Sequence, residues 1–348
     1  SSTAFKFNKT PTIVSFTLPL GVEQKIVNVV LSAYKTYVEL TPRPRIGLVI
    51  NYEKGKITDV SNIIAEIISL GGEIIFAKHS ISQNGVTRLK STGSSTLHLG
   101  SLSINLPRLA FESNKDETYF RARLALLMKP ALTSMSLRKK NISELVRLGM
   151  NPILANNTQY MQRCSTSLVI NLVGLRDAVF GILGFNDDKQ GCEVLHKVVE
   201  TSVDIALKKA KELGTDVLVT MTKSDGSGRF ISLDEEKYGK NSILKITENE
   251  TYAEGVVIDA STLADLTIKS PQIVQCNRMA KTLNGGLFTQ VKIPNGSKIT
   301  EIKKNIEKIS SLTNSFKLIM RVPLCGNCGM KDQTLSDKCP SCKSSYII

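Results

Sequence analysis

The sequence contains no tryptophan, and aromatic residues make up only 5% of its 348 positions. Proteins that bind single-stranded nucleic acid without sequence preference stack the bases on aromatic side chains, so extensive base stacking is not expected here. There is also no apolar run of about 18 residues, the length that a membrane-spanning helix needs. Residues 1–9 lack the charged and then apolar profile of a secretion signal. These absences argue against membrane and secreted proteins.

Cysteine and histidine are scarce as well. Outside the C-terminal region the only cysteines are Cys164, Cys192 and Cys276, which are scattered and do not form a disulfide framework. We therefore predict a reducing, cytoplasmic setting. The three histidines have no spacing that suggests a metal site or a catalytic triad, so we expect structural or solvent-facing roles for them. Residue 1 is a serine, which we interpret as a processed native N terminus.

Positive charge is in excess, because 45 lysines and arginines face 31 acidic residues, which gives a pI of about 9.4. Such a balance favours polyanionic partners, above all nucleic acid bound through its phosphates. Lysine- and isoleucine-rich composition also occurs in thermophiles, so a generically basic surface is the alternative interpretation. The same composition, with few cysteines, indicates an archaeal or thermophilic source. The candidate nucleic-acid-binding residues are Arg138, Lys139, Lys140, Lys208, Lys209 and Lys211. Each cluster could equally be the solvated face of a helix.

Apolar patterning alternates between strand and helix. Residues 46–50 form a short apolar run typical of a buried strand, and residues 60–70 carry isoleucines at helical spacing before a Gly-Gly pair. A strand is expected at 73–77, after which residues 83–101 are polar and rich in glycine and serine. This alternation predicts an α/β fold. Further strands are expected at 102–106, 167–173, 217–221, 256–258 and 287–293, and helices at 117–148, 194–213 and 299–312.

The C-terminal region contains two CxxC pairs, Cys325 with Cys328 and Cys339 with Cys342, with ten residues between them. Glycine and proline beside these cysteines favour tight turns that bring backbone amides toward thiolates. Four thiolates around one Zn²⁺ form a closed tetrahedral site, so the pattern predicts a structural zinc ribbon. A redox pair or a site that has lost its metal is the alternative.

A polar loop and the turn that follows the next strand could hold phosphate groups with backbone amides and hydroxyls. Neither a P-loop nor a GxGxxG fingerprint is present, so the alternative is a loop that leads into a buried strand. The candidate nucleotide-binding residues are Thr92, Gly93, Ser94, Ser95, Thr96, Asn105 and Arg108.

Several segments, in this order, resemble the anaerobic (class III, glycyl-radical) ribonucleotide reductases. They are TGSSTLHLGSLSINLPRLAFES at 92–113, LVGLRDAVFGILG at 172–184, RFISLDEEKYG at 229–239, YAEGVVI at 252–258, NGGLFTQVKI at 284–293 and the ribbon. The resemblance implies a degenerate or partial form of that family's ten-stranded α/β barrel, followed by the zinc ribbon. We therefore predict an N-terminal segment of uncertain structure at 1–41, a reductase-like α/β domain at 42–320 and the ribbon at 321–348.

The sequence also departs from the family pattern. The family holds its radical cysteine in a Cys–Arg–Leu segment before the TGS loop, where this chain has Val86-Thr87-Arg88-Leu89. The family's radical glycine lies in an Arg–Val–x–Gly–Tyr loop after the zinc site, and this sequence ends at Ile348 without one. The family's N-terminal ATP-binding domain is missing too. Radical chemistry cannot proceed without these groups, so we expect a protein that is not an enzyme.

The leading functional prediction is a catalytically inactive reductase homologue that binds nucleic acid, in particular the ribosome or another structured RNA. The first alternative is a nucleotide-binding regulatory protein that retains the reductase phosphate loop. The second is one subunit of a split anaerobic ribonucleoside-triphosphate reductase, whose radical residues would come from another chain. Fold similarity alone does not decide among these functions.

Overall fold

The computed structural model describes residues 12–17, 24–44, 46–52, 61–78, 96–150, 165–184, 189–222, 227–247, 251–332, 335 and 337–348. The chain divides into two compact units, each of which is described by itself. Unit 1 comprises Ser1–Ser82, Val257–Ile273 and Thr289–Ile348, and unit 2 comprises Gln83–Val256 and Val274–Phe288. The chain therefore passes from unit 1 into unit 2 twice and returns each time, so the predicted 42–320 segment contributes to both units.

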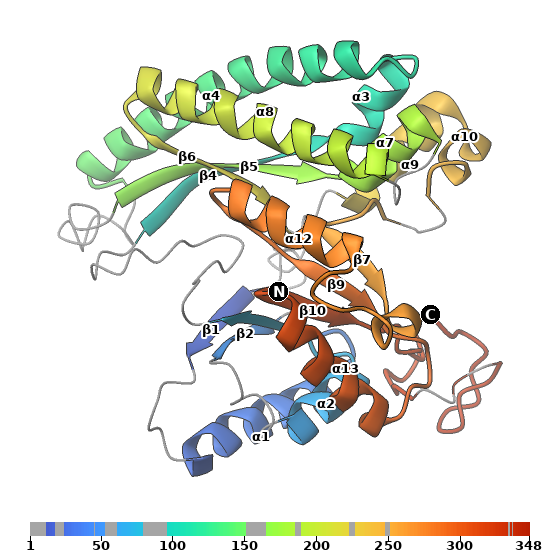
Figure 1. Cartoon of the computed structure of the whole chain (residues 1–348). Coiled ribbons are helices and arrows are strands. Elements are labelled where there is room, and N and C mark those ends of the chain that lie inside the picture. The colour runs from blue at the N-terminus through green and yellow to red at the C-terminus, as the bar shows by residue number, and fades with distance from the viewer. Residues whose placement is uncertain are drawn as a thin grey trace. The chain divides into compact units, whose positions relative to one another are not determined.

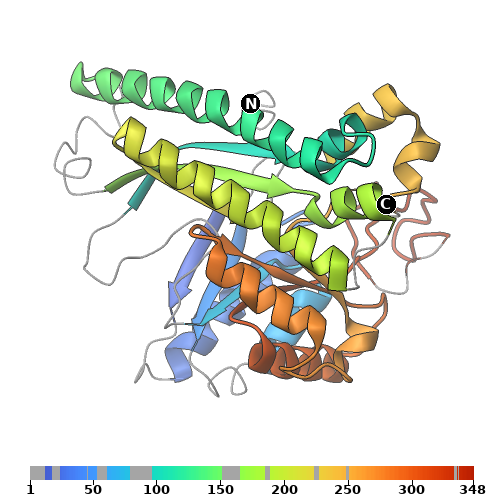
Figure 2. The ribbon, with the colours of Figure 1, turned by 45° about the horizontal axis from the view of Figure 1, so that its top comes forward.

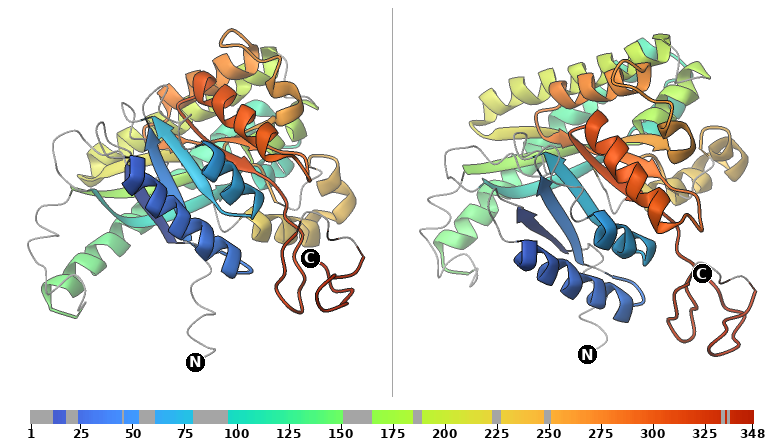
Figure 3. Two further views of the ribbon diagram at one scale, coloured as in Figure 1. Left: turned by 90° about the horizontal axis from the view of Figure 1, so that it is seen from below. Right: turned by 60° about the horizontal axis from the view of Figure 1, so that its bottom comes forward.

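Unit 1 contains a six-stranded mixed sheet in the order β1-β2-β3-β10-β9-β7. Strands β1, β2 and β3 are parallel, and β10 pairs antiparallel with β3 and parallel with β9. Helices α1, α2 and α13 lie along this sheet (Figure 3). In its core the rings of Phe76 and Phe316 stack with centroids 4.5 Å apart. The bounds are β1 (Thr12–Thr17), α1 (Gln24–Leu40), β2 (Ile46–Tyr52), α2 (Ser61–Ser69), β3 (Ile74–Lys78), β7 (Val256–Asp259), α11 (Ala260–Leu263), β9 (Thr289–Lys292), α13 (Ile299–Leu312) and β10 (Ser315–Ile319).

Unit 2 contains a four-stranded parallel sheet in the order β4-β5-β6-β8. Two long helices, α4 and α8, run side by side across it (Figures 1 and 2). The bounds are β4 (Thr96–Asn105), α3 (Leu106–Glu112), α4 (Glu117–Arg147), β5 (Ser165–Val173), α7 (Leu175–Leu183), α8 (Lys189–Leu213), β6 (Asp216–Met221), α9 (Ser227–Tyr238), α10 (Lys240–Leu244), α12 (Pro271–Thr282) and β8 (Gly286–Leu287).

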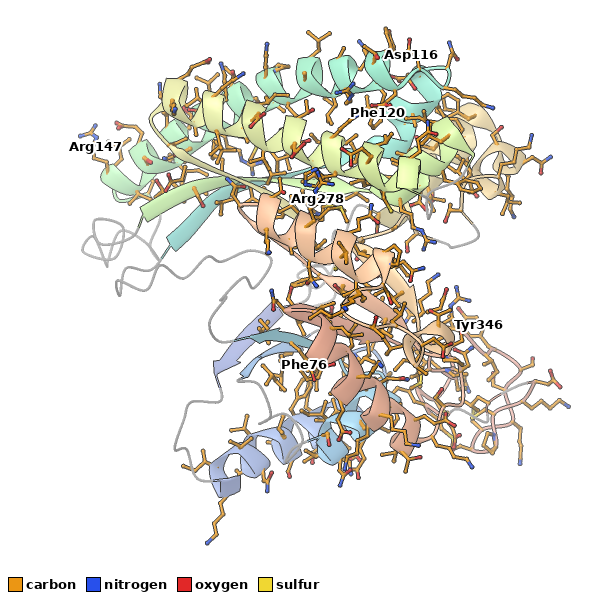
Figure 4. The ribbon with its side chains drawn as sticks, viewed as in Figure 1. Phe76, Asp116, Phe120, Arg147, Arg278 and Tyr346 are labelled. Atoms are coloured by element: carbon orange, nitrogen blue, oxygen red, sulfur yellow. The ribbon has the colours of Figure 1, made fainter. Side chains whose placement is uncertain are left out.

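Hydrophobic periodicity explains how α4 packs on this sheet. Phe120, Leu124, Met128 and Leu132 recur every four residues, and all four are fully buried. Residues four apart lie on one face of a helix, and this face joins the core formed by β5, β6 and α8. Phe120 accordingly points inward from α4 (Figure 4). Because this stripe is long and regular, the sequence predicted the helix to within a residue at its C-terminal end.

The expected α/β alternation is confirmed. Most predicted strands and helices occur within a few residues of their expected bounds. The strand expected at 102–106 begins earlier, because β4 starts at Thr96 within the polar stretch 83–101. An edge strand needs apolar residues on one face only, which explains why its composition did not reveal it. The first forty residues, which were left without an assignment, contribute β1 and α1.

The closed ten-stranded barrel that the resemblance implies stays a prediction, because the structure shows two separate sheets. None of the described helices combines the length and the apolar character that crossing a bilayer requires.

Candidate functional site

The four cysteines of the predicted ribbon are brought together at the C-terminal end of unit 1. All four sulfur atoms lie within 4.8 Å of one another. The Sγ atoms of Cys325 and Cys342 are 3.5 Å apart, and those of Cys328 and Cys339 are 3.6 Å apart. Tetrahedral coordination with metal–sulfur bonds of about 2.3 Å requires a sulfur–sulfur distance of about 3.8 Å. The cluster therefore has the donors and the dimensions to hold a metal ion that prefers thiolates.

Both halves of the cluster use the same backbone turn. The N–H of Gly329 donates to the carbonyl of Cys325, and the N–H of Lys343 donates to the carbonyl of Cys339. Both turns require a positive φ at the residue after the second cysteine, which is +78° at Gly329 and +59° at Lys343. Glycine adopts this conformation without cost, whereas lysine does not. The ribbon itself forms irregular loops (Figure 3), with the exposed Tyr346 near its end (Figure 4).

Hydrogen bonds prepare one of the thiols for deprotonation. The side-chain amide of Asn327 donates to Cys342 Sγ across 3.5 Å. Together with the backbone at Ser344, this hydrogen bond lowers the pKa of the Cys342 thiol to about 6. Thiolate is the form that binds metal, so this contact favours the ligand state at neutral pH.

The ribbon is attached to the rest of unit 1 by a lysine. The Nζ of Lys331 donates to the carbonyl oxygens of Val38 and, at 2.9 Å, Thr41. These are carbonyl groups at the C-terminal end of α1, which have no partner within the helix. Next to them, a Cβ atom added at Gly329 would lie 2.6 Å from Pro42, so the ribbon turn packs directly against the α1–β2 connection.

A buried carboxylate forms the centre of the main polar cluster in unit 2. Asp234 in α9 is completely buried. Its Oδ1 accepts from the Nε and Nη2 of Arg108 at 2.6 and 2.5 Å. Its Oδ2 accepts from the Nδ2 of Asn105 at 2.8 Å and from the hydroxyl of Tyr252 at 2.9 Å. Four donors thus compensate one buried charge, as burial of a carboxylate requires.

Two of the predicted nucleotide-binding residues belong to this cluster. Besides donating to Asp234, Asn105 caps α3, because its Oδ1 accepts from the backbone N–H of Arg108 at 3.2 Å. Asn105 and Arg108 therefore hold the end of β4, α3 and α9 together. That Asn105 and Arg108 also bind phosphate stays a prediction. The remaining candidates, Thr92, Gly93, Ser94 and Ser95, lie outside the described residues, and Thr96 begins β4.

Beside this cluster, two further hydrogen bonds fix the chain that follows Tyr252 and leads into β7. The N–H of Ala253 donates to Asp177 in α7 at 2.7 Å, and Ser227 donates to Glu254 at 2.8 Å. No sequence pattern marked Asp234, Tyr252 or Asp177 as a site residue. Their only signal was that all three lie within the segments that carry the family resemblance.

The predicted nucleic-acid-binding residues lie in α4, seven to nine residues before its last residue, and in the last two turns of α8. These parts of the two helices adjoin each other, since the Nζ of Lys139 in α4 donates to the Oγ1 of Thr215, just after α8. Lys209 pairs with Glu212 at 2.6 Å, so it too has a local partner. The remaining four candidates are exposed, and the described part of the chain gives none of them an ion-pair partner. We call them the basic patch: Arg138, Lys140, Lys208 and Lys211.

The isolated histidine in α8 has a structural environment. His196 is buried, its Nε2 lies 3.2 Å from Thr282 Oγ1, and its Nδ1 lies 3.2 Å from Glu200. At the same helix, Arg278 of α12 pairs with Glu193 at 3.2 Å (Figure 4). Cys276 is buried in the core of unit 2, and Cys192 hydrogen-bonds Gln275 at 3.0 Å. These contacts join α12 to α8.

The family model and the solved structures that match this chain point to the same family. The family model described as anaerobic ribonucleoside-triphosphate reductase matches residues 53–347. No curated protein sequence matches the chain. A solved structure described as an anaerobic ribonucleotide reductase is 16% identical, with a TM-score of 0.62, over 93% of this chain and 53% of its own length.

Two further structures extend this likeness. The Thermotoga maritima anaerobic ribonucleotide reductase with dATP in its specificity site is 18% identical, with a TM-score of 0.61, over 92% of this chain and 56% of its own. A glycyl radical enzyme from Archaeoglobus fulgidus is 10% identical, with a TM-score of 0.59, over 89% and 52%. At these identities the likeness shows the fold, and the chain spans about half the length of these structures.

Proposed function

This chain belongs to the anaerobic ribonucleoside-triphosphate reductase family, and we propose that it is a catalytically inactive member that binds structured RNA. It has Val86 and Thr87 where the family resemblance places the radical cysteine. A valine or threonine side chain cannot form a thiyl radical. The hydrogen abstraction that starts this family's chemistry therefore has no agent in this sequence. The split-reductase alternative stays a prediction.

The observation that carries the proposal is the basic patch. Its four cations come from the C-terminal halves of α4 and α8, two helices that lie side by side (Figure 1), and Lys139, between Arg138 and Lys140, reaches Thr215 just after α8. Lys211 lies in the last turn of α8, where a cation stabilises the helix dipole, but Arg138, Lys140 and Lys208 lie outside the last turns of their helices. Lys139 and Lys209, which have local partners, are not counted in the patch.

The chemistry of the patch favours duplex RNA over single strands. Double-stranded RNA is recognised mainly through phosphates, 2′-hydroxyls and shape, and lysine and arginine supply that kind of contact. Single-strand binding depends on aromatic stacking, and Leu137, Leu145 and Leu207 are the large exposed apolar residues near the patch rather than aromatic ones. We expect a hairpin RNA to bind more tightly than an unstructured homopolymer.

The test compares two variants with the same change in charge. The patch variant replaces Arg138, Lys140, Lys208 and Lys211 with glutamate. The control variant replaces four other exposed lysines with glutamate, namely Lys240, Lys269, Lys281 and Lys304. Anisotropy titrations with a labelled hairpin would be recorded between 50 and 200 mM salt.

Each lost phosphate contact lowers the slope of log K against log salt by about 0.7 to 0.9. We therefore expect the patch variant to lose about three units of slope and about 100-fold or more in affinity at low salt. The control variant should change far less. Equal losses in the two variants, or no binding of wild type at low salt, would refute the proposal. Sedimentation of native lysate with and without RNase would then show whether the RNA is ribosomal.

We also propose that the four-cysteine cluster holds Zn²⁺ in a structural role, since all four tetrahedral positions are filled by protein ligands. The scarcity and scatter of the other cysteines support a cytoplasmic location.

A further inference from the structure

Unit 2 contains a pocket that neither the metal cluster nor the basic patch explains. It has a volume of about 420 Å³ and lies where α3, α7 and α10 meet. These helices gather at one end of the unit in both Figure 1 and Figure 2. Ligand pockets in proteins span about 300 to 1,000 Å³, so this one has room for a small molecule. Neither Asn105 nor Arg108 lines it.

The walls of the pocket offer flat apolar surfaces. Phe111 and Phe180 line it from α3 and α7, and both side chains are only half-buried. The ring of Phe111 stacks on Tyr238 with centroids 4.6 Å apart, which holds it in place. Gly181 lines the wall next to Phe180 and leaves space that a side chain would occupy, since an added Cβ would lie 3.4 Å from Ile246.

Two lysines line the same pocket, Lys115 from the α3–α4 turn and Lys245 at the end of α10. The described part of the chain gives neither an ion-pair partner. The nearby acidic groups are engaged elsewhere, because Glu112 pairs with Arg123 and Lys237, and Asp116 accepts from the N–H of Tyr119. Three helices end at this pocket and contribute partial negative charge. Two full positive charges outweigh these partial ones.

The turn that carries Lys115 has an unfavourable backbone conformation. Asn114 and Lys115 both have positive φ, at 49° and 70°, and both line the pocket. Consecutive residues other than glycine rarely adopt this conformation. Backbone strain of this kind gathers at binding sites, where the surrounding structure imposes it. Here it places a lysine with no acidic partner at the rim of the cavity.

From these features we propose that the pocket binds a nucleoside monophosphate. Its base would lie against Phe111 and Phe180, and its phosphate between Lys115 and Lys245. A phosphate monoester carries a charge between −1.5 and −2 at neutral pH, which matches two lysines. This charge and a planar ring together distinguish the ligand from inorganic phosphate and from neutral nucleosides.

The test is calorimetric titration of the full chain with AMP, adenosine and inorganic phosphate. We expect saturable one-to-one binding of AMP with a Kd below about 1 mM, and binding at least tenfold weaker for the other two. Replacement of Lys115 and Lys245 with glutamine should weaken AMP binding at least tenfold, and Phe180→Leu should weaken it too. Lys240→Gln, an exposed lysine at the start of α10, is the control and should bind as wild type does.

Absence of saturable AMP binding, or equal affinity in wild type and the double lysine variant, would overturn the proposal. The monophosphate could be free or the 5′ end of an RNA chain, and a 5′-phosphorylated oligonucleotide distinguishes these sources. Competition with AMP at equal concentration would identify the chain end, and failure to compete would identify the free nucleotide. The basic patch is intact in all these variants, so the outcome is separate from that of the hairpin experiment.

Discussion

Replacement of Asp234 should destabilise unit 2 more than any other single change among its polar residues. In Asp234→Ala, Arg108, Asn105 and Tyr252 all lose the acceptor they share. Tyr252 is only 1% exposed, so its hydroxyl cannot turn to water. Removing one partner of a buried ion pair lowers the free energy of unfolding by about 3–5 kcal/mol. Because the side chain of Arg108 is one-third exposed and regains some hydration, we expect a loss of about 3–4 kcal/mol in the free energy of unfolding.

Milder variants calibrate this value. Asp234→Asn keeps the volume and one acceptor oxygen but loses the charge, so it should cost about 2 kcal/mol. Tyr252→Phe removes a single donor and leaves the carboxylate with three, so it should cost about 1 kcal/mol. The double variant Arg108→Ala/Asp234→Ala should be less destabilised than the sum of the two single variants, because each single change already breaks the pair.

The assay is urea unfolding followed by far-ultraviolet circular dichroism, with free energies extrapolated to water. Ser232→Ala in the same helix is the matched control, since Ser232 is exposed and its hydroxyl donates to the carbonyl of Gly228 in α9 itself. A cost below about 1 kcal/mol for Asp234→Ala would show that the cluster is not what holds α3, α9 and the Tyr252 segment together.

Three further predictions concern the ribbon and the buried tyrosines. Cys339→Ser should abolish stoichiometric zinc in metal analysis of the purified protein, whereas Cys192→Ser should retain it; retained zinc in Cys339→Ser would argue against a four-thiolate site. Lys331→Met should speed proteolysis of the ribbon, because two carbonyl groups at the end of α1 lose their donor, and Lys338→Met should not. Burial raises the pKa of Tyr34 and Tyr252, so in the folded state these groups stay protonated above pH 10, where unfolded tyrosines ionise. Their stabilisation is complete below pH 10 and decreases above it, so the urea midpoint should fall between pH 9 and 11, and less steeply in Tyr252→Phe.

Regular elements with long apolar periodicity could be predicted from the sequence. Helix α4 repeats its buried residues every four positions. In β5, every residue of Leu168–Val173 except Asn171 is apolar. The two CxxC pairs are equally local, so the cluster of four sulfur atoms followed directly from spacing.

Features that depend on long-range contacts could not be predicted in this way. Asn105 and Asp234 are 129 residues apart in sequence, and nothing in the composition of α9 marks Asp234 as buried among its acidic neighbours Glu235 and Glu236. A long-range contact also decides which of the predicted basic residues in α4 has a partner within the chain and which are exposed. Lys139 and Lys140 are adjacent in sequence, yet one donates to Thr215 and the other is exposed, because helical geometry turns them by about 100° from each other.

The segments that carry the family resemblance are mainly those that hold unit 2 together. Besides the Asp234 cluster, Asn284 from the NGG segment bonds the backbone of β6 twice, at Val217 and Val219. At Gly255 an added Cβ would lie 2.1 Å from the carbonyl oxygen of Phe288, so the backbone there admits no side chain. Such contacts depend on the fold and not on whether a radical is generated. They can therefore persist whether or not a chain is active, which is why likeness in these segments informs fold far more than activity.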